Sequence, residues 1–445
     1  MKKLFKQIYL GNRLFFTLGV ICLFYILAFF FPFLIWVAHS LLVLVALVFM
    51  VDVLLLFRTK EGIVSQRILP EKLSNGDENQ VKIDIKNNYD FGVEVSVIDE
   101  VPFQFQLRDF EIIRKLSKGE NEYFEYALNP KNRGEYTFGS LNIFTTSPIG
   151  FVRRRFIFNK DKMIPSYPSF IHLPKYEIMA LQNEFLMGGI KKIRRIGHTM
   201  EFEQIKDYVI GDDIRNINWK ATGKRNQLMV NQYQEEKSQR IYMLIDKGRT
   251  MKMPFDELSL LDYAINASMA LSHIVLKKKD HAGVMTFSRK VENVLAADGK
   301  PGQLKKVAET LYNIDTNFDE SDFSRLYTDL KYKVNRRSLM ILFSNFETLD
   351  ALQRQLKYLR GIARNHLLIV VFFKNPEIMK ISRGGNRESM QDVYDQIIAE
   401  KFEYEKKLIR QELQKYGIQS VYTLPENLSI SVINKYLEVK ARGVL

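Results

Sequence analysis

The stretch Glu201–Gln234, EFEQIKDYVIGDDIRNINWKATGKRNQLMVNQYQ, separates two differently patterned halves of a chain of 445 residues. It is too polar to be a membrane segment. Directly after it the sequence becomes apolar at Ile241–Ile245 and then reaches the carboxylate of Asp246. The stretch therefore leads into a strand that is expected to end on an acidic residue.

A turn and a tryptophan dominate this stretch. Gly211 precedes Asp212 and Asp213, which suits a turn because glycine tolerates positive φ and aspartate accepts from nearby backbone donors. Arg215 could form a forked ion pair with either aspartate. Trp219, one of two tryptophans in the sequence, is expected to be a packing anchor with a buried ring. We predict that these five residues form a structural clasp, and a ligand-binding role is the alternative.

Two long apolar runs open the sequence. Leu14–Phe31 carries no charge, Pro32 interrupts the pattern, and Phe33–Phe57 carries one charge, at Asp52. About 20 apolar residues span a bilayer as a helix, so residues 1–60 are predicted to be a transmembrane hairpin of two helices. Lysine and arginine flank the pair and are absent from its turn. This bias predicts that the two helices cross the cytoplasmic (inner) membrane with both termini and the rest of the chain in the cytoplasm. Asp52, near the end of the second run, is expected to reach water.

The rest of the chain divides into three parts. Residues 61–165 alternate apolar and polar side chains, as in Val81–Ile85 and Phe103–Leu107, which predicts a small antiparallel β-sandwich. Within it, Arg153–Arg155 is expected to be a solvated strand edge. Residues 166–239 are expected to be a connector that holds the Gly-Asp-Asp signature. Residues 240–445 alternate apolar strands with amphipathic helices, which predicts an α/β, doubly wound, mostly parallel sheet.

Ligands of such sheets bind at the carboxyl ends of the strands. Two predicted strands end on polar residues: the first reaches Asp246, and the third is followed by Ser344 and Asn345. We therefore expect the ligand-facing edge of the sheet at these residues.

Composition and motifs argue against several functions. The net charge of +14 could favour nucleic acid or anionic lipid. The basic residues are spread along the chain rather than gathered on one aromatic face, so nucleic acid is not the first choice of partner. A single cysteine, Cys22, excludes an internal disulfide and a cysteine-based zinc site. The sequence lacks a Walker A loop, a His-Glu-x-x-His helix and a Gly-x-Ser-x-Gly elbow, and we expect a protein that is not an enzyme.

Several motifs together resemble the domain of unknown function 58 family. They are Gly211-Asp212-Asp213, Arg215, Ile217 and Trp219-Lys220-Ala221, with Arg133-Gly134-Glu-Tyr136 and Ser147-Pro148-Ile-Gly150-Phe151 upstream. The α/β half resembles a von Willebrand factor type A domain. The resemblance implies a partner, because proteins of this family are linked with MoxR-type AAA+ ATPases.

Domains of the von Willebrand factor type A kind hold Mg²⁺ or Mn²⁺ through an Asp-x-Ser-x-Ser loop, a later threonine and a second aspartate. The resemblance implies that Asp246 is the first aspartate and that Thr250 replaces the last serine. Gly248 stands in place of the middle serine, Asn345 in place of the second aspartate, and Thr316 is the candidate for the threonine. Since hard cations bind according to ligand charge and number, this predicts a degenerate metal site.

The first hypothesis is therefore a membrane-anchored adaptor that works with such an ATPase in protein assembly or envelope maintenance. The alternative is a basic protein that binds nucleic acid or anionic lipid through its positive charge. A hydrolase would need Asp212, Asp213 or Asp246 as a general base, and no partner residues in the sequence support that role.

Overall fold

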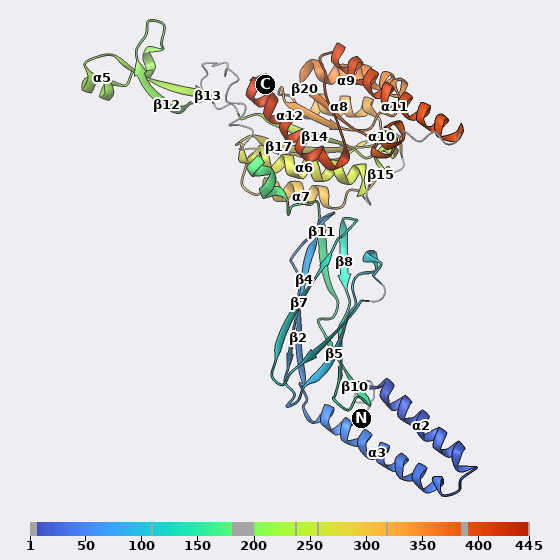
Figure 1. Cartoon of the computed structure of the whole chain (residues 1–445). Coiled ribbons are helices and arrows are strands. Elements are labelled where there is room, and N and C mark those ends of the chain that lie inside the picture. The colour runs from blue at the N-terminus through green and yellow to red at the C-terminus, as the bar shows by residue number, and fades with distance from the viewer. Residues whose placement is uncertain are drawn as a thin grey trace. The chain divides into compact units, whose positions relative to one another are not determined.

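The computed structural model describes residues 7–107, 110–179, 200–235, 238–255, 258–316, 319–383 and 390–443. Two compact units make up the chain, Met1–Tyr167 and Pro168–Leu445. Figure 1 shows the elements of each unit.

Two apolar helices open the first unit. Helix α2 spans Asn12–Ala28 and helix α3 spans Leu34–Arg58, and the two pack against each other. Among the described residues, α3 is the one helix both long and apolar enough to cross a bilayer, whereas α2 has 17 residues. The structure thus confirms one helix of the predicted pair as long enough for a span.

Antiparallel sheets follow the helices, as the alternating pattern predicts. One sheet has the order β1-β10-β9-β5-β6 and another the order β2-β4-β7, and residues of both sheets share one buried core. A third sheet, β3-β11-β8, is mixed, because β3 runs parallel to β11, and it builds a separate core around Phe138. The strands are β1 Ile8–Leu10, β2 Ile63–Ile68, β3 Leu73–Ser74, β4 Asn79–Asn87, β5 Val93–Asp99, β6 Glu111–Leu116, β7 Asn121–Leu128, β8 Gly134–Phe138, β9 Leu141–Thr146, β10 Val152–Phe158 and β11 Lys162–Tyr167.

One predicted strand is a short helix instead. Phe103–Phe105 form a 3₁₀ turn that follows Pro102 and ends at Gln106, whose φ is 54°. Proline cannot donate to a strand ladder and a positive φ breaks the extended conformation, so the alternation of apolar residues was misleading here.

The last turns of α3 bury two side chains, those of Asp52 and Leu56. Asp52 has no exposed surface, and its carboxylate accepts from the backbone N–H groups of Phe151 at 2.9 Å and Val152 at 2.8 Å and from the hydroxyl of Ser147. The expectation that Asp52 reaches water is therefore wrong, because the loop before β10 covers it. That loop is the Ser-Pro-x-Gly-Phe motif.

Arg154 secures the same junction from the middle of β10. Its buried guanidinium donates to the carbonyl oxygens of Thr59 at 2.6 Å, Lys60 at 2.9 Å and Leu56 at 2.5 Å. The last carbonyls of a helix have no partner within the helix, so Arg154 completes the C-terminus of α3. It is not the solvated edge residue that the sequence suggests. Asp52 and Arg154 together fix α3 to the sheet.

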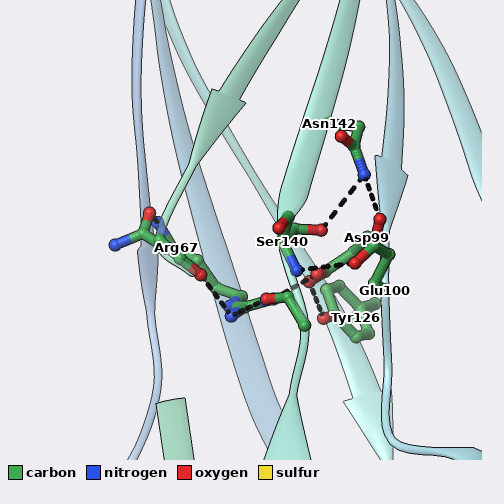
Figure 2. A network of polar contacts seen from close by, with 8 residues as sticks. Arg67, Asp99, Glu100, Tyr126, Ser140 and Asn142 are labelled. Atoms are coloured by element: carbon green, nitrogen blue, oxygen red, sulfur yellow. Dashed lines mark hydrogen bonds and ion pairs between the residues drawn. The ribbon is translucent and has the colours of Figure 1, made fainter. Parts of the chain in front are cut away.

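A buried ion pair links the strands farther along this unit (Figure 2). Arg67 pairs with Asp99, and neither side chain is exposed. The hydroxyl of Tyr126 donates to the other oxygen of Asp99 at 2.5 Å, and Arg67 also donates to the carbonyl of Gly139 at 2.9 Å. Burial raises the pKa of Asp99, while Arg67 and Tyr126 act in the opposite direction. The network thus joins β2, β5 and β7 through one desolvated carboxylate.

The second unit contains a six-stranded mixed sheet of order β18-β17-β14-β19-β20-β21. Five strands are parallel and β18 is antiparallel to β17. Helix α6 packs with α7 and α12, and α9 packs with α8 and α11. The elements are β14 Arg240–Asp246, α6 Leu260–Lys277, β17 His281–Phe287, β18 Val291–Asp298, α7 Gln303–Tyr312, α8 Phe323–Lys333, β19 Leu339–Phe343, α9 Leu349–Asn365, β20 Leu367–Phe373, α10 Pro376–Arg383, α11 Met390–Lys415, β21 Gln419–Thr423 and α12 Leu428–Arg442.

The sheet explains why its strands are apolar throughout. Tyr242 and Leu244 of β14 belong to the core that contains residues of α8, α9 and α11, and the intervening residues of β14 are equally buried. A strand covered on both faces needs no polar alternation. The strand order reverses between β14 and β19, which are neighbours with Ile245 opposite Phe343. Their carboxyl ends therefore meet at one edge, as predicted.

Candidate functional site at the carboxyl edge of the mixed sheet

Asp246 lies at the centre of this edge. Its side chain is 1% exposed, and its oxygens accept from the hydroxyl of Ser344 at 2.6 Å, the backbone N–H of Gly248 at 2.8 Å and the hydroxyl of Ser321. Burial raises the pKa of Asp246, and the three hydrogen bonds act against that rise. The carboxylate thus ties together the loop after β14, the loop after β19 and the loop before α8.

Gly248 is what allows Ser321 to approach. A Cβ atom at position 248 would lie 2.1 Å from the Oγ of Ser321, closer than any side chain tolerates. The hydroxyl that the sequence lacks at position 248 is therefore supplied by Ser321, 75 residues away from Asp246. Thr316 is the candidate for the later threonine, and its backbone N–H bonds to Asp315 at 2.7 Å. Sequence spacing could not have found Ser321, because only the fold brings the two loops together.

Asn345 sits on the same edge beside a buried cation. The ammonium of Lys406, from α11, lies 3.4 Å from the Oδ1 of Asn345 and donates to the carbonyl of Phe346. Burial lowers the pKa of Lys406 to about 8, with Glu347 and Glu405 partly offsetting the effect. The positive charge of Lys406 therefore lies beside Asn345, the neutral residue that stands where the second aspartate of a metal site is expected.

These residues do not fit the Mg²⁺ or Mn²⁺ that the sequence resemblance implies. Across the described ranges, no three or more Asp, Glu, His or Cys side chains lie close enough to hold a metal ion. Asp246 offers one carboxylate with both oxygens engaged, and Lys406 approaches Asn345. Thr250 lies in the 3₁₀ turn Arg249–Met251. Hard divalent ions bind carboxylates together with other oxygen ligands, and here a neutral amide beside the ammonium of Lys406 stands where the second carboxylate is expected.

A polar pocket of about 350 Å³ opens beside Ser321. Its lining includes charged groups of both signs from the loop before α8 and from α9, namely Glu320, Ser321, Asp322, Arg354, Lys357 and Tyr358. Such a pocket can pair with ionic and hydrogen-bonding groups of a partner. It extends the edge built around Asp246 onto the surface.

The Gly-Asp-Asp signature forms the end of a β-hairpin. Strands β12, Met200–Asp207, and β13, Met229–Glu235, are antiparallel. Between them lie the 3₁₀ turn Ile214–Asn216 and helix α5, Trp219–Arg225. Gly211 has a φ of 111°, which confirms the predicted glycine turn.

The two aspartates of the signature hold the turn in different ways. Asp212 pairs with Lys206 at 2.9 Å and accepts from the N–H of Val209 at 3.0 Å, and Lys206 is the main cause that lowers its pKa. Asp213 caps the 3₁₀ turn by accepting from the backbone N–H of Arg215 at 3.0 Å. The forked side-chain pair predicted for Arg215 is therefore wrong, because Lys206 takes that place and the backbone satisfies the other carboxylate.

Trp219 is not the buried anchor that the sequence predicts. The residue is 71% exposed, and Ile210 on the same hairpin is 97% exposed. Trp219 is the first residue of α5 and directly follows the cap residue Asn218. The signature therefore stabilises a turn and leaves apolar side chains on the surface.

Comparison with known proteins bears on this part of the chain. Residues 204–420 match the family described as protein of unknown function DUF58. The match begins in the hairpin and extends into β21, so it includes both the signature and the carboxyl edge. The uncharacterized protein YeaD of Bacillus subtilis (strain 168) is 24% identical over 164 residues, which are 37% of this chain and 39% of that protein.

Solved structures give only distant likeness. The conserved hypothetical protein BatB from Bacteroides thetaiotaomicron is 11% identical with a TM-score of 0.27, over 46% of this chain and 98% of that one. A PapD-like domain of human CEP192 is 11% identical with a TM-score of 0.18, over 24% of this chain and 83% of that one. Scores this low decide nothing about the fold.

Proposed function

We propose that this chain is a membrane-anchored adaptor whose second unit is a von Willebrand factor type A-like domain. Its partner is a MoxR-type AAA+ ATPase, and the pair acts in protein assembly or envelope maintenance. The strand order of the mixed sheet and the resemblance of the signature support this proposal.

The observation that carries the proposal is the hydrogen bonding of Asp246 within the fold. Both carboxylate oxygens accept hydrogen bonds, from Ser321, Ser344 and Gly248, so the carboxylate holds three loops in one shape. Rigid loops at the carboxyl edge suit recognition, because less conformational freedom is lost on binding. The polar pocket beside Ser321 gives a partner charged groups to contact.

The membrane arrangement belongs to the same proposal. Both α2 and α3 cross the cytoplasmic membrane, and the three phenylalanines after α2 lengthen its apolar segment. The flanking lysines and arginines place both termini and the second unit in the cytoplasm. Asp52 and Arg154 fix the β-strands of the first unit directly to α3, so the first unit is held at the membrane without a flexible linker.

Native co-purification tests the adaptor role. The tagged full chain is solubilised gently from its own membranes with ATP and Mg²⁺, and the eluted proteins are identified by mass spectrometry. We expect an AAA+ ATPase, and we expect Arg354→Glu in the pocket lining to reduce its recovery at least about tenfold, as loss of an interface anchor does. Arg364→Glu is the matched control, since it makes the same charge change on the same helix outside the pocket lining.

Two results would count against the proposal. One is recovery of the ATPase that is equal for Arg354→Glu and Arg364→Glu, which would exclude the pocket. The other is nucleic acid in the eluate that is released at moderate salt with no protein partner, which would favour binding through the positive charge of the chain.

A further inference from the structure

The end of the hairpin exposes an apolar surface of unusual density. We call it the hairpin tip, Val209–Arg225. Val209, Ile210, Ile214 and Trp219 are all exposed large apolar residues. A two-stranded hairpin is marginally stable by itself, and contiguous exposed apolar side chains mark interaction sites. The tip therefore presents a surface that a partner would cover.

Helix α11 exposes a second apolar surface. We call it the α11 stripe: Met390, Tyr394, Ile397, Ile398 and Tyr404, all exposed. Their spacing places them on one face of the helix. The helix is buried through a different face, at Ala399. An amphipathic helix normally turns its apolar face inward, whereas these five side chains are exposed in the part of the chain that the structure describes.

The two surfaces carry opposite charge. The hairpin tip includes Arg215, Lys220, Lys224 and Arg225 against two aspartates, and one of these, Asp212, already pairs with Lys206. The sequence Met390–Tyr404 includes four acidic residues and one lysine. Two of these acids, Asp395 and Glu400, accept hydrogen bonds from the side-chain amides of Gln391 and Gln396. Because these amides are neutral, the two bonds do not cancel the negative charge of either acid.

We propose that the hairpin tip of one copy of this chain binds the α11 stripe of a second copy. Apolar residues on each surface would cover the other, and the basic tip would face the acidic flanks of the stripe. Both surfaces remain exposed on a single chain, so a contact between copies is the arrangement that covers both. Anchoring in a membrane would raise the local concentration of copies and favour such a contact.

This contact joins two different surfaces. If both copies donate their tips to each other, the pair closes as a two-fold dimer. If only one tip is used, each contact leaves one tip and one stripe uncovered, and the assembly continues to a ring or an open chain. The carboxyl edge around Asp246 takes no part in the contact. The experiments can therefore refute the proposed adaptor role and still find self-association.

Energy transfer between labelled copies tests the contact. Full-length chains carrying donor or acceptor dyes are mixed in liposomes at a fixed ratio of protein to lipid. We expect transfer that falls with rising salt, and about tenfold weaker association for either Trp219→Ser or Ile397→Ser. Tyr332→Ser is the control, because Tyr332 on α8 is an equally exposed aromatic residue outside both surfaces. Unchanged melting temperatures would show that all three variants fold.

Charge exchange makes the test specific. Lys224→Glu and Arg225→Glu together should weaken association, and adding Asp395→Lys and Glu400→Lys should restore it. A photoreactive residue at Trp219 should cross-link to the α11 stripe in mixtures of isotopically light and heavy chains, giving light–heavy products. Cross-links confined to a single chain or to lipid would overturn the proposal, as would transfer that neither Trp219→Ser nor Ile397→Ser changes.

Discussion

Replacing Asp52 by alanine should release the start of β10 from the end of α3. The carboxylate accepts from the N–H groups of Phe151 and Val152 at 2.9 and 2.8 Å, and it also accepts from the hydroxyl of Ser147. All of these groups lie in a buried environment. Alanine removes the acceptor and leaves the two backbone donors without a partner, whereas the hydroxyl of Ser147 can rotate to another acceptor.

The loss of stability follows from the two backbone N–H donors that Asp52→Ala leaves without an acceptor. A buried donor left unsatisfied costs about 1–3 kcal/mol, so two of them cost about 2–6 kcal/mol. Each 1.4 kcal/mol is a factor of about ten in an equilibrium constant. Amide hydrogen exchange at Phe151 and Val152, which reports local opening, should therefore become roughly 30-fold to 20,000-fold faster.

Hydrogen exchange followed by mass spectrometry on the full chain in detergent measures this effect. Peptides covering residues 147–154 report the junction, and peptides from the mixed sheet report the rest of the chain. Ser40→Ala is the matched control, because Ser40 lies on α3, is exposed and bonds only to the carbonyl of Val37 in its own helix. If exchange at residues 147–154 were the same for Asp52→Ala and Ser40→Ala, the junction would not depend on the carboxylate and the reasoning would fail.

Three further outcomes are expected. Arg67→Met should destabilise the first unit by about 3–5 kcal/mol, because it leaves Asp99 buried without its cation. Burial raises the pKa of Asp99 above 3.8, so the folded state binds the Asp99 proton more tightly than the unfolded chain does. The variant should therefore regain stability as the pH falls through that raised pKa. Pulse proteolysis in urea at pH 7 and pH 5 measures the free energy of unfolding, and a loss of stability that grows on acidification would contradict the prediction. Gly248→Ser should destabilise the second unit by about 1–3 kcal/mol through its clash with Ser321, and adding Ser321→Gly should relieve the loss of melting temperature. Trp219→Ala should change stability by less than about 0.5 kcal/mol, because the ring is exposed, and a clear drop in melting temperature would show that the ring is packed.

Much of the second unit could be predicted from local pattern. The helix Gln303–Tyr312 and the strand Leu367–Phe373 belong to the alternation of amphipathic helices and apolar strands that the sequence predicts for residues 240–445. The spacing of apolar residues along a helix or strand indicates which of its faces is buried, and this spacing can be read from neighbouring residues in the sequence. Asp246 could be placed at the carboxyl edge for the same reason, because it directly follows an apolar strand. The edge strand Val291–Asp298 was missed, since its apolar side chains alternate too weakly to stand out.

The sequence by itself determined most elements of the mixed sheet, the apolar N-terminal helices and the glycine turn at Gly211. Only the tertiary structure decided what the polar groups do. Asp52 was expected in water and is buried, because residues almost 100 positions away supply its donors. Trp219 was expected in a core and is exposed. Ser321 reached Asp246 only through the packing of two loops. The free energy of a polar or aromatic side chain depends on the groups that the fold places around it, and sequence neighbours carry little of that information.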